Sequence, residues 1–429
     1  MRILITDEMS LSTVFSSFDR SFLYSFSFVP TVITARQLAA VTPSHHTVAI
    51  QEGKTSIDFE AKYDVVHINF KTALAPRAYE VADAFRKKGK RVVLSGYHPS
   101  ALPDEAAQHA DSVIVGDAVT LWPVVVQDLE DGTLQPVYTS TDTRDTLILP
   151  STHLIKLKGL QLTNSIEATR GCPHKCDFCQ DANIRDGSVF RTRSLDDVIQ
   201  EIASLQQKIF FFTDFSLTID LVYTKELFRR MRPLKKRFIC GGNVDVLGED
   251  EELLRLSHEA GCIEWISGFE TFSQESLNGA HKQSNIVDDY ARAVKKIHKY
   301  RMAVFGTFVL GFDEDTPDIF QMMQTHIGRL GIDAVNFALL TPYPGTPLFA
   351  RLEKEKRILT KDWSKYNRKN VVFAPKNMTK TELEDGFRSI TRSFSSLPSM
   401  GYRTMRSLSL GLYPFMATFA GNLGQYMKT

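Results

Sequence analysis

Three of the five cysteines of this 429-residue chain lie in one short segment, residues 167–181, with the sequence EATRGCPHKCDFCQD. They are Cys172, Cys176 and Cys179, in the spacing Cys-x3-Cys-x2-Cys. Gly171 and Pro173 flank the first cysteine and predict a turn there. Thiolates this close together in the chain are able to converge on one metal centre, so metal or cluster binding is the first chemistry that the sequence suggests.

Two kinds of centre are compatible with three thiols. A structural zinc ion takes four ligands, so Cys240, Cys262 or His174 would have to complete the site. An iron–sulfur cluster is usually held by four thiolates. With only three, one iron keeps an open position, which suits the amino and carboxylate groups of a small molecule. The spacing alone leaves both alternatives open.

An alternation of strands and helices after about residue 160 is expected to position the cysteine segment. Six apolar runs are strand candidates: residues 165–169, 208–214, 237–244, 262–270, 302–312 and 333–340. Helices separate them, such as 194–208 with Ser194 as N-cap and acids in its first turn. Six β/α units predict a partial TIM-like (β/α)6 barrel over residues 161–375, with its chemistry at the carboxyl ends of the strands.

The first part of the chain, residues 1–137, predicts a doubly wound, Rossmann-like parallel sheet, because short apolar runs alternate with amphipathic segments. Ligands of such sheets bind at the carboxyl ends of the strands, where this chain carries Gly96, His98 and Gly116. No GxGxxG follows the first strand, which disfavours a dinucleotide. Residues 138–160 are expected to be a linker, and residues 376–429 a helical C-terminal extension.

The cysteine segment resembles the signature of the radical S-adenosylmethionine enzymes, which carry an aromatic residue just before the last cysteine, here Phe178. Four further segments are similar to that family in the same order: Arg170 with RTRSLDDVIQEI, then GFETFSQESLNGAHK, VFGTFVLGFDEDT and FALLTPYPGTPLF. The resemblance implies a 4Fe-4S cluster on the three cysteines. Its open iron would bind S-adenosyl-L-methionine, which one electron cleaves to a 5′-deoxyadenosyl radical.

The same resemblance implies roles for single residues of the barrel. Glu270 would contact the ribose or the amino group of S-adenosyl-L-methionine, and Gly311 would lie beside its adenosine. Asp214 would be a cofactor ligand, although the family often has paired acids where this chain has one; the alternative is a solvated acid at a strand end. Apart from the resemblance, spacing alone nominates no acid or base for the substrate, although Tyr343, near the sixth strand end, is a candidate to test.

Residues 95–123 are similar to the family's subgroup with an N-terminal cobalamin-binding domain, which includes C-methyltransferases and the anaerobic Mg-protoporphyrin ester cyclase. Two positions depart from its pattern, because Ser95 replaces a glycine and Asp117 a glutamate. The Asp-x-His-x-x-Gly motif that supplies a ligand to cobalt is absent from the sequence. The resemblance implies a cobalamin contacted by Gly96, His98 and Gly116, or a fold retained without the ligand; His98 alternatively caps a strand end.

The resemblance implies an enzyme that functionalises an unactivated carbon of a hydrophobic small molecule, such as a tetrapyrrole or a polycyclic lipid. Cobalamin-dependent C-methylation is the favoured reaction. The alternative is oxidation without cobalamin, either hydroxylation of a methyl group towards a formyl group or ring closure. A non-catalytic protein that binds zinc or a cluster is the third hypothesis. An electron donor such as flavodoxin or ferredoxin is implied as a partner.

The composition limits the other partners. The formal charge of +1, without a basic block, argues against nucleic acid. The acidic N-terminal segment and the absence of a long apolar stretch predict a cytoplasmic protein. Six aromatic residues in 14–30 predict either a pocket or interdomain core. The tail has no acid after Asp385; it is expected to dock as helices, to cover a hydrophobic substrate, or to contact a membrane surface.

Overall fold

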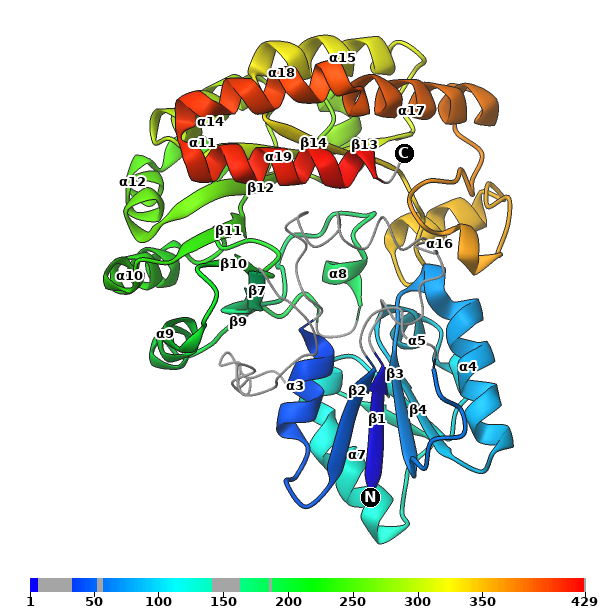
Figure 1. The fold of residues 1–429 in the computed structure, drawn as a ribbon. Coiled ribbons are helices and arrows are strands. Elements are labelled where there is room, and N and C mark those ends of the chain that lie inside the picture. Colours follow the sequence, from blue (N-terminus) through cyan, green and yellow to red (C-terminus); the bar gives the residue numbers. More distant parts are fainter. Residues whose placement is uncertain (7–32, 52–56, 141–162, 185–186, 428–429) are drawn as a thin grey trace.

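The computed structural model describes residues 1–6, 33–51, 57–140, 163–184 and 187–427. Two α/β units lie one above the other in Figure 1, with the N-terminal unit at the bottom and a barrel-like unit above it. The expected linker and the aromatic stretch 14–30 lie almost entirely outside the described residues. Within the described part of the chain, every helix is too short or too polar to cross a membrane.

The N-terminal unit is a parallel six-stranded sheet in the order β2-β1-β3-β4-β5-β6. Its strands are β1 (Arg2–Thr6), β2 (Thr47–Gln51), β3 (Val65–Asn69), β4 (Arg91–Ser95), β5 (Ser112–Val115) and β6 (Val137–Thr139). Its helices are α3 (Thr34–Val41), η1 (Thr72–Leu74), α4 (Ala75–Lys87), α5 (Tyr97–Ala101), α6 (Pro103–Ala106) and α7 (Ala118–Asp131). Separate apolar clusters form with α4 on one face and with α3 and α7 on the other, which confirms the doubly wound prediction.

Two elements of this unit were not expected from the sequence. Helix α7 is capped at its N-terminus by Asp117, whose side chain accepts a hydrogen bond from the N–H of Val119, and at its C-terminus by Gly132, which has a φ of 70°. Its apolar face packs on the sheet in spite of the internal Pro123. Strand β6 then extends the sheet to Thr139, two residues past the boundary expected at 137.

The second unit is an open parallel sheet in the order β14-β13-β12-β11-β10-β7. Its strands are β7 (Thr163–Ile166), β10 (Ile209–Phe212), β11 (Arg237–Gly241), β12 (Cys262–Glu270), β13 (Ala303–Leu310) and β14 (Ala334–Leu339). The two edge strands, β7 and β14, do not pair with each other. All six strands follow the expected runs, so the prediction of a partial (β/α)6 barrel is confirmed.

The helices of this unit cover the outer face of the sheet and bury the largest apolar cluster of the molecule. They are α9 (Leu195–Ser204), α10 (Leu221–Met231), η2 (Arg232–Leu234), α11 (Val244–Glu249), α12 (Glu251–Ala260), α13 (Gln274–Gly279), η3 (Val287–Asp289), α14 (Tyr290–Lys299), α15 (Ile319–Leu330), α16 (Pro347–Lys354) and η4 (Trp363–Lys365). Ser194 occupies the predicted N-cap position of α9, with Asp196 and Asp197 in the first turn, although its side chain makes no capping hydrogen bond.

The cysteine segment lies between β7 and α9, inside a small substructure. The antiparallel strands β8 (Thr169–Arg170) and β9 (Arg191–Thr192) flank it, and α8 (Gln180–Asn183) closes it. The chain ends in three helices, α17 (Lys380–Ser395), α18 (Leu397–Ser407) and α19 (Leu412–Tyr426), with the single turn η5 (Leu408–Leu410) before the last. The expected helical extension is therefore confirmed.

Candidate cluster and cofactor site

The segment with the three cysteines is fixed at its first residues. Gly171 has a φ of 90°, and a Cβ atom there would lie 2.0 Å from the carbonyl oxygen of Val189. The backbone N–H of Cys172 donates to the carbonyl of Gly187 at 2.8 Å. Only glycine fits this close backbone crossing, so Gly171 sets the direction in which the chain enters the cysteine loop.

The three thiols suit a cluster better than a single zinc ion. Burial raises the pKa of all three, Cys172, Cys176 and Cys179, and each lies within electrostatic reach of another. Thiolates on one tetrahedral zinc ion are about 3.8 Å apart, given a Zn–S bond of about 2.3 Å. Among the described residues, the three sulfurs do not form a group within 4.8 Å of one another. In a 4Fe-4S cluster each thiolate binds a different iron, so the three sulfurs do not have to lie within 4.8 Å of one another.

The other ligands that zinc would need are engaged elsewhere. The sulfurs of Cys240 and Cys262 lie 3.9 Å from each other, buried between β11 and β12. His174 Nε2 contacts Asn243 Nδ2 at 2.8 Å. The structure therefore does not bring any of these three residues to the cysteine triad as a fourth ligand, and the zinc alternative loses its support.

A buried ion pair faces the three thiols. Lys282 Nζ lies 3.6 Å from Glu270 Oε1. Burial opposes the charge of Lys282, but Glu270 and the three cysteines raise its pKa overall. Burial also raises the pKa of Glu270, and Lys282 opposes that shift. The pair therefore places one positive charge where the sulfurs and the carboxylate converge.

The backbone around Glu270 is strained. Its φ is 62°, unusual for a residue with a side chain, and the pairing of β12 with β13 shifts register between Gly268 and Glu270. Asn285 Nδ2 stabilises this bulge by donating to the carbonyls of Gly268 at 2.7 Å and Phe269 at 3.1 Å. Strain of this kind gathers at functional sites. The sequence analysis predicted a role for Glu270 but none for Lys282. The signal for Lys282 is that it is the last residue of segment 268–282, which resembles the radical S-adenosylmethionine enzymes.

Phe178 lies beside a small cavity of about 250 Å³. Its ring meets Phe312 edge-on, with the centroids 5.7 Å apart. Phe312 follows Gly311, which has a φ of 102° and donates its N–H to Asp315 Oδ2 at 2.9 Å. The structure thus brings the predicted Phe178 against Phe312, which the sequence analysis missed although it directly follows the predicted Gly311; Gly311 itself is not among the described residues that line this cavity.

Asp214 holds backbone and does not face a cavity. Its carboxylate accepts hydrogen bonds from Thr169 Oγ1 at 2.7 Å and from the N–H of Ala168 at 3.2 Å. Burial raises its pKa to about 7. The expectation of a cofactor ligand and the alternative of a solvated acid are both unsupported, because the side chain is buried and its oxygens position the strand that leads to the cysteines.

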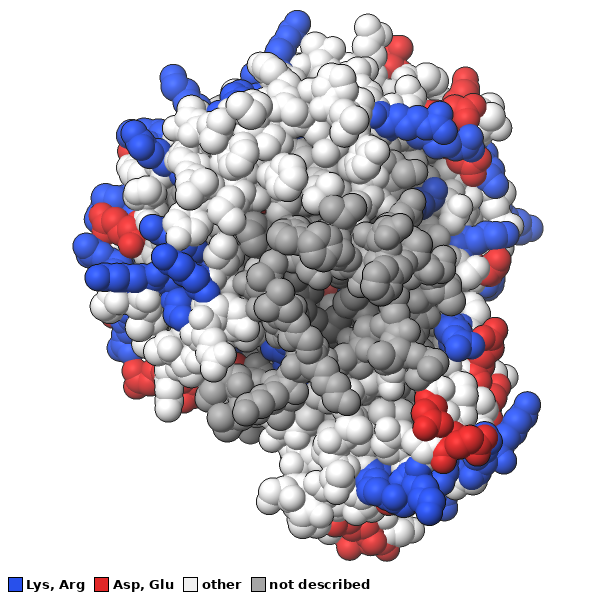
Figure 2. Space-filling model, in the orientation of Figure 1, with Lys and Arg blue, Asp and Glu red and all other residues white. Residues whose placement is uncertain are grey.

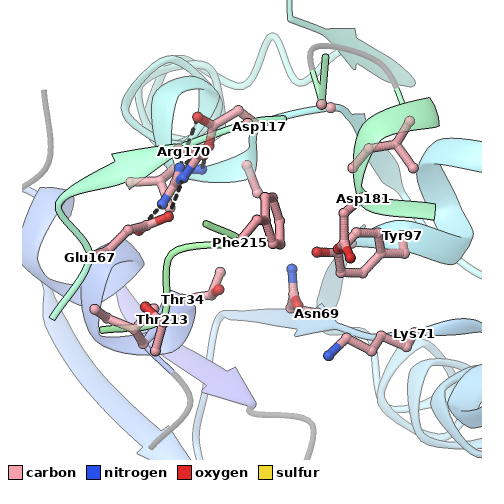
Figure 3. A pocket seen from close by; sticks show the side chains of 18 of the residues that line it. Thr34, Asn69, Lys71, Tyr97, Asp117, Glu167, Arg170, Asp181, Thr213 and Phe215 are labelled. Carbon is pink, nitrogen blue, oxygen red and sulfur yellow. Dashed lines mark hydrogen bonds and ion pairs between the residues drawn. The ribbon is translucent and has the colours of Figure 1, made fainter. Parts of the chain in front are cut away.

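A pocket of about 380 Å³ lies between the two units, where the carboxyl ends of both sheets meet (Figure 3). The N-terminal unit contributes Asn69, Lys71, Gly96, Tyr97 and Gly116, and the barrel contributes Asp181, Thr213 and Phe215. A Cβ atom on Gly96 would lie 2.5 Å from the carbonyl oxygen of Phe70, so only glycine fits. Phe215 is 43% exposed and its ring projects into the pocket. Lys71 and Asp181 both affect the pKa of Tyr343, which burial raises.

His98 lies outside the residues that line this pocket. Its ring is fully buried, and Nε2 is 3.0 Å from Glu105 Oε1. The ring of Trp363, from the barrel unit, meets it with the centroids 5.3 Å apart, and Trp363 Nε1 donates to Glu105 at 3.0 Å. A cofactor contact by this side chain is therefore unsupported; His98 packs at a strand end and joins the two units.

An ion network closes one side of the pocket (Figure 3). Arg170 Nη1 donates to both carboxylate oxygens of Asp117 at 2.9 Å, and its Nε donates to Glu167 at 2.8 Å. Arg191 Nη2 reaches the same Asp117 at 3.2 Å. Burial raises the pKa of Asp117, but the two arginines lower it overall, so the carboxylate is held ionised. The residue before Gly171 is thereby tied to the first turn of α7.

Comparison with known proteins yields one family and several relatives. The Radical SAM superfamily matches residues 166–326. The chain is 32% identical, over 77% of its length and 74% of the relative, to bacteriochlorophyllide d C-12(1)-methyltransferase of Chlorobaculum tepidum. It is 31% identical to the C-8(2)-methyltransferase of the same organism, over 77% of each chain. An anaerobic magnesium-protoporphyrin IX monomethyl ester cyclase of Cereibacter sphaeroides is 27% identical, over 52% of this chain and 37% of that one.

Solved structures share the fold of both units. The radical S-adenosylmethionine methyltransferase TsrM from Kitasatospora setae, with cobalamin and a 4Fe-4S cluster bound, matches with a TM-score of 0.64 at 15% identity, over 82% of this chain and 78% of that one. The cobalamin-dependent enzyme OxsB, with aqua-cobalamin and S-adenosylmethionine bound, matches with a TM-score of 0.65 at 12% identity, over 95% and 68%.

Proposed function

The chain belongs to the radical S-adenosylmethionine superfamily of enzymes, which use a 4Fe-4S cluster and S-adenosyl-L-methionine, and on that basis we propose that it methylates a carbon of a chlorophyll-type tetrapyrrole. The observation that carries this proposal is the likeness to two bacteriochlorophyllide d methyltransferases, which extends over about three quarters of each chain. A likeness over 77% of this chain includes the cysteine segment.

Cys172, Cys176 and Cys179 are proposed to hold the cluster. When bound, the cluster would supply the electron that cleaves S-adenosyl-L-methionine to a 5′-deoxyadenosyl radical. Lys282 and Glu270 carry opposite charges beside the thiols, which suits the carboxylate and the amino group of the methionyl end. Phe178, Phe312 and the backbone at Gly311 would surround the adenosine, because flat aromatic faces suit a nucleobase.

The pocket between the units is proposed to hold cobalamin on the side of the N-terminal sheet. Gly96 and Gly116 both have positive φ and let backbone approach a ligand closely. Cobalamin would carry the methyl group. The flat substrate would lie towards the barrel, where Phe215 exposes an aromatic face to the pocket. The proposed domains match this division. Residues 1–137 would bind cobalamin, and residues 161–375 would bind the cluster and S-adenosyl-L-methionine.

Oxidation of a similar tetrapyrrole without cobalamin is the second candidate. The likeness to a magnesium-protoporphyrin IX monomethyl ester cyclase favours it, as does the lack of an Asp-x-His-x-x-Gly motif. The likeness is shorter and weaker than that to the methyltransferases, so methylation is preferred. A reductant such as flavodoxin or ferredoxin and a location in the cytoplasm complete the proposal.

Anaerobic reconstitution tests the assignment of the cluster. The wild-type protein is expected to bind about four irons and to release 5′-deoxyadenosine from S-adenosyl-L-methionine with dithionite. The Cys172→Ala, Cys176→Ala and Cys179→Ala variants are each expected to lose both properties. Cys262→Ala, which removes a buried thiol outside the triad, is the matched control and should retain them. Retention of iron and cleavage in a triad variant would contradict the assignment.

The reaction is tested with a bacteriochlorophyllide substrate and S-adenosyl-L-methionine labelled in its methyl group. Methylation predicts one bound cobalamin per chain and a labelled product heavier by one methylene group. A product that gains oxygen or closes a ring, from a protein that binds no cobalamin, would establish the second candidate instead. Lys282→Met should retain iron but weaken S-adenosyl-L-methionine binding about tenfold or more, because one ion pair to its carboxylate is lost.

A further inference from the structure

Helix α19 turns its large apolar side chains outward. Leu412, Met416, Phe419, Leu423 and Tyr426 recur at intervals of four and three residues, which places them along one face of a helix. Leu412 is 66% exposed, and Phe419 and Tyr426 are each 47% exposed. None of the 15 residues of this helix is charged. A helix of a globular protein usually buries such a stripe, so its exposure calls for a partner.

The opposite face of α19 is held against the barrel by small and polar residues. Ala417 packs into a cluster with strand residues such as Phe211 and Ile263. A Cβ atom on Gly421 would lie 3.1 Å from the Phe305 ring, so the helix lies close to the sheet. Asn422 Nδ2 donates to the carbonyl of Asp333 at 3.1 Å. The orientation of the helix is therefore fixed, and the apolar stripe cannot rotate inward.

The neighbouring helix continues the apolar surface. Helices α18 and α19 lie side by side across the barrel (Figure 1), and α18 with η5 exposes four further large side chains: Leu397, Tyr402, Met405 and Leu408. More than half of the exposed large hydrophobic residues in the described part of the chain thus belong to 397–426. Figure 2 shows this face as almost uncharged, with lysine and arginine side chains along its borders and a few aspartate and glutamate side chains among them.

The charged residues of the chain beyond Asp385 are all basic, whereas the start of α17 carries Glu384 and Asp385, which pair with Arg388. At the start of α19, Lys208 and Arg237 lie over the ring of Tyr413, at 5.7 and 4.8 Å from its centroid. Arg392 is exposed on α17. An apolar face with a basic border suits an anionic lipid surface, into which aliphatic and aromatic side chains insert while cations contact the head groups.

We infer that the exposed face of α18 and α19 docks on the surface of a membrane with anionic lipids. A second copy of the chain is disfavoured as the occupant, because a self-complementary interface would bring basic borders against each other. This contact does not depend on which reaction the enzyme performs. It would give the active site access to hydrophobic molecules that partition into the bilayer.

Vesicle flotation tests the inference with the full, reconstituted protein. Wild-type protein is expected to float with vesicles of phosphatidylcholine and phosphatidylglycerol, and less with phosphatidylcholine alone or at high salt. The Leu412→Ser, Phe419→Ser double variant should bind at least about tenfold more weakly, because two inserted side chains are lost. Val222→Ser, at a residue 83% exposed on α10, is the matched control and should bind as the wild type does.

Three outcomes would overturn the inference. The first is a wild-type protein that does not float with the anionic vesicles. The second is a double variant that floats as well as the wild type does. The third is a wild-type protein that is dimeric without lipid by light scattering and becomes monomeric in the double variant, which would make a second copy the occupant. Circular dichroism checks that the variants remain folded, and 5′-deoxyadenosine release in solution should be unchanged in both.

Discussion

Glu264 lies on β12 with its side chain buried, and its Oε2 atom has no hydrogen-bond partner among the described residues. Burial, and after it the negative charge of Asp333, raises its pKa to about 8. Glu270, on the same strand, is also buried but faces Lys282. The two glutamates, six positions apart, therefore differ in environment. Glu264 is buried without a charged partner in the described part of the chain and favours its neutral form, whereas Glu270 lies beside the cysteines and pairs with Lys282.

Replacement of Glu264 by glutamine should change the pH dependence of stability. The pKa of this carboxyl is about 4.3 in the unfolded chain and about 8 in the folded protein. Between these values the folded state binds a proton that the unfolded state releases, so wild-type stability falls as the pH rises. Glu264→Gln has no carboxyl group to titrate, so its stability should not fall in this way. Its melting temperature should therefore exceed that of the wild type by a margin that grows between pH 5 and 8. Each unit by which the pKa differs between the folded and unfolded states corresponds to about 1.4 kcal/mol of stability.

Calorimetry at several pH values measures this difference. Glu251→Gln is a suitable control, because Glu251 is exposed and its hydrogen bond to Lys299 lowers its pKa. That variant should show no gain in stability as the pH rises. A constant difference between Glu264→Gln and the wild type across the range would show that Glu264 is ionised in the folded protein.

The cysteine segment depends on elements of both units. Strands β8 and β9 pair Arg170 with Arg191, and both guanidinium groups reach Asp117 at the start of α7. Asp117 also caps α7 through the N–H of Val119. One carboxylate therefore caps the N-terminus of a helix of the N-terminal unit and orients the two strands that flank the cysteine loop.

Asparagine at position 117 should separate these two tasks. It caps a helix about as well as aspartate does, but it has no charge for the two arginines. Asp117→Asn is expected to lower the free energy of unfolding by about 1.5–3 kcal/mol, the range for hydrogen bonds to charged groups. It should also change the electron paramagnetic resonance spectrum of the reduced cluster, because Arg170 and Arg191, on the strands that flank the cysteine loop, lose their ion pairs with Asp117.

Asp220→Asn is the matched control for this variant. Asp220 caps α10 by accepting from the N–H of Tyr223 at 2.9 Å, and no ion pair involves it among the described residues. The control should have wild-type stability and a wild-type spectrum. Equal effects of the two substitutions would mean that Asp117 acts only as a cap.

The two units of the molecule are joined on both sides of the pocket. On one side Arg170 meets Asp117, and Gln37 Nε2 donates to Glu167 at 2.7 Å. On the other side Trp363 of η4 packs against His98 and donates to Glu105. Because contacts lie on both sides, the pocket between the sheets is shaped by the relative position of the units, and not by either alone.

Removal of the Trp363 ring should weaken this joint. Trp363→Ala is expected to cost about 3 kcal/mol of interdomain packing, at the low end of values for buried aromatic residues. Calorimetry should then resolve two unfolding transitions where the wild-type protein shows one, since the units no longer stabilise each other. Tyr402→Ala, which removes an exposed aromatic ring from α18, is the control and should leave a single transition. A single, merely shifted transition in Trp363→Ala would contradict this picture.

The sequence by itself determined the elements and the order of the fold. All six barrel strands and the first five strands of the N-terminal sheet follow apolar runs, because a strand buried on both faces has to be apolar throughout its length. The cysteine motif was equally visible, since its three thiols lie within eight residues of one another. Helix α7 was missed because Pro123 interrupts its pattern, although its cap Asp117 and terminal Gly132 were signals.

Only the tertiary structure decided which partner each individual polar residue contacts. Glu105 and Trp363 are 258 positions apart, and Asp117 and Arg170 are 53 apart, so no local pattern announces either contact. For the same reason the sequence left two alternatives open for each of Asp214 and His98; in the structure Asp214 binds backbone N–H groups, and His98 packs at a strand end, which was one of its two alternatives. The outward stripe of α19 has the same basis: periodicity shows that a helix has an apolar face, but only packing against the barrel fixes whether that face points inward or outward.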